Sequence, residues 1–220
     1  MASSGNPDLT RISELAAKAC DGSALTSEEA LLLYRGLDQP SLGLVANDIR
    51  LRISPPQADG SVKATFIVDR NLNPTNVCVT DCGFCAFYRS PGDADAYVLP
   101  REVIYQKVDE LIAQGGMQLL LQGGHHPKLK TDWYAELFQD LKQRYPQVWI
   151  HGMSPPEITH VAKMEKRPVQ DVLTDLKAAG LQSIPGGGAE ILVESVRKVI
   201  APKKATTDEW LEVMRQWGRM

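Results

Sequence analysis

Beyond residue 61, short apolar runs alternate with longer amphipathic stretches. The apolar runs predict strands, and apolar residues at helical spacing predict helices between them. No hairpin signal joins successive strands, which indicates a parallel sheet with the helices outside it. A doubly wound sheet and a (β/α) barrel both satisfy this pattern. The predicted strands are "VKATFIV", "MQLLL", "VWIHGM" and "LQSI", and the predicted helices are "REVIYQKVDELIAQGG", "TDWYAELFQDLKQRYP", "PVQDVLTDLKAAG" and "TTDEWLEVMRQWG".

A purely helical pattern precedes this region. Three amphipathic helices are predicted in "PDLTRISELAAKACDG", "LTSEEALLLYRG" and "SLGLVANDIRLRI", and the loop "SPPQADGS" follows them. Thr26 and Glu29 have the spacing of a capping box at the start of the second helix. We therefore expect a small helical segment over residues 1–61, with a packing or lid role, and a strand–helix region over residues 62–220.

Composition limits the classes of function. The chain has 220 residues, 43% apolar and 23% charged, and its net charge of −3 gives no basic surface for nucleic acid. The longest apolar runs are too short to span a bilayer, and the start "MASSGNPDLTRISEL" contains no apolar signal region. We therefore expect a cytoplasmic protein without nucleic-acid or membrane partners. Thiols stay reduced in that compartment, so clustered cysteines indicate ligands or redox groups instead of disulfides.

Polar and glycine-rich sequences follow the predicted strands. They are the cysteine-containing stretch after "LNPTNV", "QGGHHP" after "MQLLL", "SPPE" after "VWIHGM", and "PGGGAE" after "LQSI". Because the carboxyl ends of parallel strands carry the active site in α/β folds, these four clusters are expected to converge on one mouth. "PGGGAE" lacks the lysine and the serine or threonine that follow the glycines of a phosphate-binding loop.

Three of the four cysteines lie within eight residues, at Cys78, Cys82 and Cys85. Thiolates at this spacing can bind a metal from one loop. A structural zinc site needs a fourth ligand, for which His125 is a candidate. A four-iron, four-sulfur cluster usually takes four cysteines, and with three it leaves one iron open to a substrate or cosubstrate. Three unrelated thiols are the remaining alternative, and Cys20, in a predicted helix, is expected to have no such role.

The C-x3-C-x2-C spacing, with Phe84 directly before the last cysteine, resembles the radical S-adenosylmethionine (SAM) enzymes. The resemblance implies a [4Fe–4S] cluster bound by Cys78, Cys82 and Cys85, with SAM chelating the open iron. It also implies an external electron donor, whose electron cleaves SAM to methionine and a 5′-deoxyadenosyl radical. The implied fold is about the first half of a (β/α) barrel of the radical SAM type, preceded by the small helical segment.

The same resemblance implies that residues after the second strand bind SAM. Gln122, Gly123 and Gly124 occupy the place of a Gly-Gly-Glu-like turn, but His125 stands where the acidic residue is usual. The backbone of the two glycines is then a better candidate than Gln122 for holding the SAM amino group, because glycine allows close approach. A strand-to-loop turn without contacts is the alternative.

Phe84, Ser154 and Glu190 complete the predicted cofactor site. Phe84 is expected to pack near the adenine of SAM. Ser154 begins "SPPEI" and Glu190 lies in "PGGGAEI", two stretches in which prolines and glycines hold the backbone in place. Glu190 is a candidate acceptor for the ribose hydroxyls or the amine of SAM, or else an exposed glutamate in the first turn of a helix.

The sequence identifies no catalytic residue beyond one positional candidate, His125. It follows a strand end and would act as an acid or base near neutral pH. His151 lies within a predicted strand, and His160 lies beyond the "SPPE" turn.

Five stretches together resemble the branch of menaquinone-forming (futalosine pathway) and deazaflavin-forming enzymes, which implies a small nucleoside-derived substrate and a carbon–carbon bond-forming cyclisation. Pro74 departs from the branch, where an aromatic residue is common, and members continue beyond "WLEVMRQWGRM". We therefore expect a piece of a longer enzyme, catalytically silent and oligomeric or poorly soluble alone, with an exposed apolar stripe at Trp210, Leu211, Met214 and Trp217. The five stretches are "TNVCVTDCGFCAFYR", "LLLQGGHHP", "SPPEI", "SIPGGGAEIL" and "DEWLEVM".

Overall fold

A computed structural model describes residues 9–220 of the chain. The chain divides into two compact units, Met1–Phe66 and Ile67–Met220. The described part of the first unit consists of α1 (Leu9–Cys20), α2 (Ser27–Gly36) and α3 (Gln39–Ile53).

The first unit has a small core of its own. Ile12, Leu15 and Leu33 are buried between its helices. The predicted capping box is confirmed, because the backbone N–H of Thr26 donates to the Glu29 carboxylate at 2.9 Å and the hydroxyl of Thr26 accepts from the backbone N–H of Glu29 at 3.2 Å. This small domain therefore begins its second helix where the sequence predicts.

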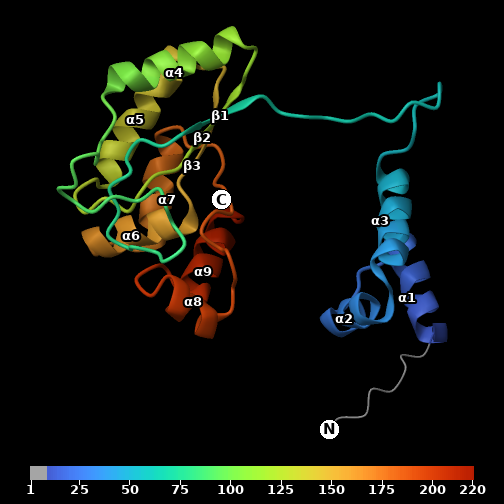
Figure 1. Ribbon diagram of the computed structural model, residues 1–220. Helices are drawn as coiled ribbons and strands as arrows, with labels where there is room; N and C mark the ends of the chain where they lie inside the picture. The colour runs from blue at the N-terminus through green and yellow to red at the C-terminus, as the bar shows by residue number, and fades with distance from the viewer. Residues whose placement is uncertain (1–8) are drawn as a thin grey trace. The chain divides into compact units, whose positions relative to one another are not determined.

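The second unit is built on a parallel sheet in which the strands lie in the order β1-β2-β3. β1 (Asp69–Leu72) pairs with β2 (Gln118–Leu121), and β2 pairs with β3 (Trp149–Gly152). Consecutive strands are neighbours, and helices connect them, as Figure 1 shows. This sequential order is that of a (β/α) barrel, and the first three strands of a doubly wound sheet of order 3-2-1-4-5-6 have it as well. The three strands therefore agree with the partial barrel that the resemblance implies.

Helices bury the apolar face of each strand. The fully buried strand residues Leu119, Leu121 and Ile150 join one core cluster with Phe138 and Leu173 from the helices. In Figure 1, α8 and α9 lie together in the red part of the chain, and the backbone N–H of Thr207 donates to Glu194 at 3.0 Å. The helices of this unit are α4 (Arg101–Ala113), α5 (Thr131–Arg144), α6 (Pro155–Glu165), α7 (Val169–Ala178), α8 (Glu194–Ile200) and α9 (Thr207–Trp217).

Two predicted strands are absent from the part of the chain that the structure describes. Residues 62–68 lie outside any strand, and Phe66 is 88% exposed; only Val68, at the end of the run "VKATFIV", accepts a backbone hydrogen bond, from Met117 at 3.1 Å. β1 begins one residue after this run. "LQSI" runs beside β3 but makes only an isolated bridge, between Ser183 and His151. "VKATFIV" is not a strand because β propensity is realised only where a neighbouring strand and a buried face exist. "LQSI" has both, since Leu181 and Ile184 are buried, but its pairing with β3 is limited to a single bridge.

Two helices were missed by the sequence analysis. α6 begins at the "SPPE" stretch that was expected to be a turn, and α8 follows the glycine-rich loop. Ser154 caps α6, prolines occupy its first positions, and Glu157 completes a capping box. The signal for α6 was therefore present in the sequence as S-x-x-E.

The apolar stripe of α9 is largely covered, contrary to expectation. Met214 and Trp217 pack against the main core, and the indole N–H of Trp210 donates to the carbonyl of Gly187 at 3.0 Å. Leu211 is only 37% exposed. The helix folds back onto α6, so its apolar face finds partners within this unit.

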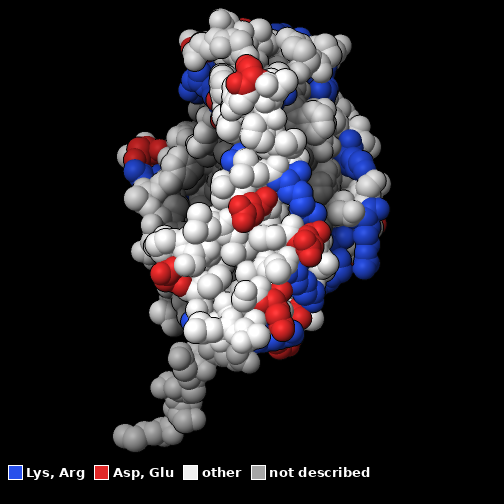
Figure 2. Space-filling model, turned by 90° about the vertical axis from the view of Figure 1, so that its right-hand side faces the viewer, with Lys and Arg blue, Asp and Glu red and all other residues white. Residues whose placement is uncertain are grey.

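Acidic and basic side chains are interspersed over the face of the molecule shown in Figure 2. Of the helices in residues 9–220, none combines the length and the apolar character needed to cross a bilayer.

Candidate functional site

A cavity lies at the carboxyl ends of the three strands and collects the residues that follow them. All of the predicted cofactor and metal residues line it, together with several that were not predicted. Its lining consists of Asn73, Cys78, Thr80, Cys82, Phe84, Cys85, Phe87, Tyr88, Gln122, Gly123, Gly124, His125, Ser154, Glu157, Gly188, Glu190 and Lys204.

The cysteine loop brings three thiols to one wall of this cavity. Cys78, Cys82 and Cys85 are all free, and the Sγ of Cys78 lies 2.9 Å from the hydroxyl of Thr80. Burial raises the pKa of the Cys82 thiol, and the charge of Lys204 opposes that rise. Cys20 lies outside the cavity, on α1.

The backbone is strained next to the cavity at three non-glycine residues. Asp81, Met153 and Glu190 have φ values of 38°, 52° and 41°, in the left-handed region that side chains disfavour. Asp81 precedes Cys82, and Met153 precedes Ser154. Strain of this kind is retained where the surrounding structure fixes it, and it gathers at functional sites.

The two glycines after β2 pack against the cysteine loop. A Cβ on Gly124 would lie 2.2 Å from the carbonyl oxygen of Val77 and 3.0 Å from the Cβ of Cys78. The N–H of Gly124 donates to Thr75 at 2.9 Å, and the N–H of Gly123 donates to Glu157 at 2.9 Å. Glycine is therefore required here by close approach of the protein's own backbone, which is a different reason from the cofactor contact predicted.

Glu157 is a buried carboxylate that the sequence analysis did not single out. It accepts hydrogen bonds from the backbone N–H of Ser154 at 2.7 Å, from the Ser154 hydroxyl at 2.6 Å and from Gly123. Burial raises the pKa of Glu157, and these hydrogen bonds oppose the rise. The carboxylate thus ties the end of β2 to the start of α6. The Ser154 hydroxyl donates to this carboxylate within the protein.

His125 does not have the environment of an acid or base that works near neutral pH. Its side chain is 6% exposed and stacks on His160 with ring centroids 5.1 Å apart. Burial lowers the pKa of His125 to about 3, and the positive charges of His160 and Lys204 act in the same direction. The ring is therefore neutral at pH 7.

The cavity is also lined by Gly188, Glu190 and Lys204, which follow the last predicted strand. Glu190 follows the glycine-rich loop in a non-helical segment, and its carboxylate accepts from the Nζ of Lys204 at 2.8 Å. The alternative that Glu190 begins a helix is therefore wrong. The guanidinium of Arg197, 4% exposed, donates to the carbonyls of Gly188 and Ala189 and to that of Ala205. Arg197 thus fastens the loop to the segment that carries Lys204.

The donor set fits an iron–sulfur cluster. Three free thiols from one loop line a cavity that also holds a cation and hydrogen-bonding groups. Within residues 9–220, no three His, Cys, Asp or Glu side chains converge on a point that a single ion would occupy.

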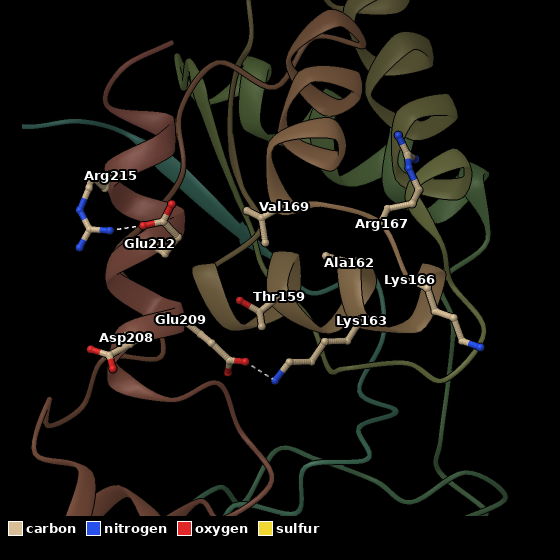
Figure 3. A pocket seen from close by; sticks show the side chains of 10 residues that line it. All are labelled: Thr159, Ala162, Lys163, Lys166, Arg167, Val169, Asp208, Glu209, Glu212 and Arg215. Atoms are coloured by element: carbon tan, nitrogen blue, oxygen red, sulfur yellow. Dashed lines mark hydrogen bonds and ion pairs between the residues drawn. The ribbon is translucent and has the colours of Figure 1, made fainter.

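A larger cavity of about 630 Å³ lies between α6 and α9. Figure 3 shows the ion pair between Lys163 and Glu209, at 2.6 Å, across its mouth. The side chains lining it include no thiol and no histidine, and it is remote from the cysteine loop. The chemistry of the lining, and not the volume, therefore assigns the site to the cysteine cavity of about 230 Å³.

Gly124→Ala should displace the cysteine loop. The added methyl group meets backbone atoms that cannot rotate away, so we expect about 1–3 kcal/mol of destabilisation and reduced iron binding. Gly187→Ala is the matched control, because its nearest contact is the flexible amide end of Gln122. Urea unfolding, monitored by tryptophan fluorescence, measures the stability of each variant. Iron analysis measures its iron binding. Equal losses in the two variants would contradict this account.

The parallel strand–helix order, with a three-cysteine loop at the carboxyl ends of the strands, defines a radical SAM fold. The chain belongs to the radical SAM superfamily, whose pattern residues 72–219 match. Members of this superfamily are enzymes that use a [4Fe–4S] cluster and SAM.

Similar proteins are known at the level of sequence and of structure. The chain is 41% identical to the cyclic dehypoxanthine futalosine synthase of Halalkalibacterium halodurans over 90% of its own length and 52% of that protein. It is 37% identical to the 5-amino-6-(D-ribitylamino)uracil–L-tyrosine 4-hydroxyphenyl transferase of Methanopyrus kandleri, over 96% of the chain and 55% of that protein. The crystal structure of HydG, a maturase of the [FeFe]-hydrogenase, superposes with a TM-score of 0.73 at 17% identity, covering 96% of this chain and 45% of that one. The chain thus spans about half the length of the curated relatives it matches.

Proposed function

We propose that this chain carries the cluster- and SAM-binding part of a cyclic dehypoxanthine futalosine synthase, which acts in menaquinone biosynthesis. The observation that carries the proposal is the 41% identity to that enzyme over 90% of the chain. The stretches "CAFYRSPGDADAYVL" and "SIPGGGAEIL" favour the cyclase over aminofutalosine synthase and over the deazaflavin-forming sisters.

The reaction joins two parts of one small nucleoside-derived substrate. When bound, the cluster and SAM supply a 5′-deoxyadenosyl radical, which takes a hydrogen atom from the ribose of dehypoxanthine futalosine. The sugar radical would then add to the imine carbon of the opened base and form the carbon–carbon bond, and the radical adduct would lose an electron to a one-electron acceptor and a proton to water. The chain needs an external one-electron donor for this chemistry, and its free thiols fit a reducing compartment such as the cytoplasm.

The described residues have separate roles in this proposal. Cys78, Cys82 and Cys85 hold the cluster from one loop. Phe84 and the residues after β2, Gln122 to Gly124, border the space for SAM. The ends of these strands are held by protein hydrogen bonds, which fixes the position of the groups before any ligand binds. Ser154 and Glu190 also line the cavity.

The second candidate is a transferase of the deazaflavin pathway, which the similarity to the Methanopyrus kandleri enzyme supports at comparable strength. Anaerobic incubation with SAM, a reductant and each candidate substrate in turn separates the two, with products identified by mass spectrometry. We expect cyclisation of dehypoxanthine futalosine in a protein that includes this chain. Formation of a 4-hydroxyphenyl adduct from tyrosine, with no cyclic product, would favour the transferase. Stoichiometric zinc without iron–sulfur absorption would contradict both.

Phe84→Ala should weaken SAM binding by about 1 kcal/mol, which is about fivefold in affinity, because an aromatic contact is lost. The side chain is 50% exposed at the edge of the cavity, so little stability should be lost. Phe66→Ala is the control, since Phe66 is 88% exposed and lies outside the cavity. Equilibrium dialysis with labelled SAM measures the affinity. An unchanged affinity would show that Phe84 has no part in binding.

A further inference from the structure

Lys204 is the single Lys or Arg among the described residues that line the cysteine cavity. Its side chain is 12% exposed, so water screens its charge only partly. The Nζ lies 5.5 Å from the centre of the Phe84 ring, next to Cys85. A fixed positive charge therefore faces the wall on which the three thiols lie.

Glu190 is paired with this cation. Its carboxylate accepts from the Nζ of Lys204 at 2.8 Å and lies 3.9 Å from the guanidinium of Arg197. Arg197 holds the backbone on both sides of the pair, through Ala189 and Ala205. The cation and its carboxylate are thus placed by a buried scaffold and do not swing freely in solvent.

We propose that the positive charge of Lys204 raises the reduction potential of the iron–sulfur cluster. Glu190 limits this effect because its carboxylate partly neutralises the charge of Lys204. The inference rests on the proposed cluster-binding function. Three thiolates and a [4Fe–4S] core carry a net negative charge, and one added electron makes it more negative. A nearby cation stabilises the reduced form more than the oxidised form, because Coulomb energy grows with the charge that it faces. The electron comes from the external donor, and no bond is formed or broken in this step.

The Lys204–Glu190 pair predicts shifts of the midpoint potential that have opposite signs in two variants. Lys204→Met removes the cation and should lower the midpoint potential, so that the ratio of reduced to oxidised cluster at a fixed potential falls about tenfold, or about 59 mV for one electron. Glu190→Gln releases the cation from its partner and should raise the potential. Lys204→Arg keeps the charge and should stay near the unsubstituted chain.

Lys203 provides a matched control in the neighbouring position. It also faces the cysteine loop, through an ion pair with Asp81 at 2.8 Å, but its side chain is 60% exposed. Water screens such a charge, so Lys203→Met should change the ratio less than about twofold. The comparison of the two variants thereby separates the effect of the partly buried Lys204 charge from the effect of losing an exposed lysine in the same segment.

The test uses the full 220-residue chain, reconstituted anaerobically with iron and sulfide and titrated without SAM, with the reduced cluster followed by electron paramagnetic resonance. Iron and sulfide contents are matched before potentials are compared. If Lys204→Met holds no cluster, the upward shift of Glu190→Gln decides the question. The inference would be overturned if the potentials of Lys204→Met and Glu190→Gln shifted in the same direction, or if Glu190→Gln showed no shift. It would also be overturned if Lys203→Met shifted the potential as much as Lys204→Met. If the unsubstituted chain binds no cluster, both the proposed function and this inference are contradicted. If the chain binds a cluster whose midpoint potential does not change in Lys204→Met, only this inference is contradicted.

Discussion

Cys82→Ala should abolish binding of the iron–sulfur cluster. Cys82 is the most buried of the three loop thiols, with 6% exposure, and among the described residues no fourth cysteine lines the cavity to replace it. With two thiolates left, two irons would lack a protein ligand, and the cluster would be lost on desalting. Iron analysis and the visible absorption of the anaerobically reconstituted chain measure this outcome, and Cys78→Ala and Cys85→Ala should behave alike.

Cys20→Ala is the control for this series. Cys20 lies on α1 in the first unit, where its Sγ contacts the carbonyl of Val45 at 4.0 Å. The substitution should leave the iron content unchanged. Full cluster retention in Cys82→Ala, or loss in Cys20→Ala, would show that the loop thiols are not the ligands.

Arg197→Met should destabilise the second unit by about 3 kcal/mol, because buried carbonyl groups lose their donor together with the charge. Arg197 is 3% exposed and donates to four carbonyls, at distances between 2.6 and 3.3 Å. All four tryptophans lie beyond residue 66, at positions 133, 149, 210 and 217, so their fluorescence reports the unfolding of this unit alone.

Arg215→Met is the matched control, because the Arg215 side chain is 50% exposed and pairs only with exposed Glu212. A change of no more than about 0.5 kcal/mol is expected there. Equal midpoints in urea for Arg197→Met and the unsubstituted chain would mean that the glycine-rich loop holds its position without Arg197.

The parts of this molecule that depend on local sequence were predictable. The helix boundaries follow from capping boxes and apolar spacing, as at Thr26 and Thr206. The cysteine loop is equally local, since its three thiols lie within eight residues. "VKATFIV" failed because pairing, which is not local, decides whether a β-prone run becomes a strand.

The rest of the site depends on contacts between distant residues. Glu157 reaches Gly123 across 34 positions, and nothing in "SPPE" indicates that its carboxylate is buried. Lys203 and Lys204 are adjacent and identical in type, yet one is exposed and the other lines the cavity. Only the path of the backbone, held by Arg197, separates their roles.

The contact between the cysteine loop and the segment around Ile200 has a consequence for the order in which the site is assembled in the cell. The N–H of Gly83 donates to the carbonyl of Ile200 at 2.9 Å, so this side of the loop is closed by a segment more than 100 residues later in the chain. At 5–20 residues per second, a ribosome needs about 6 to 23 seconds to make that stretch. The nascent thiols therefore exist before Ile200 can cover them, which gives iron-delivery or oxidation chemistry a period during translation that ends when the Ile200 segment has been made and has packed on the loop.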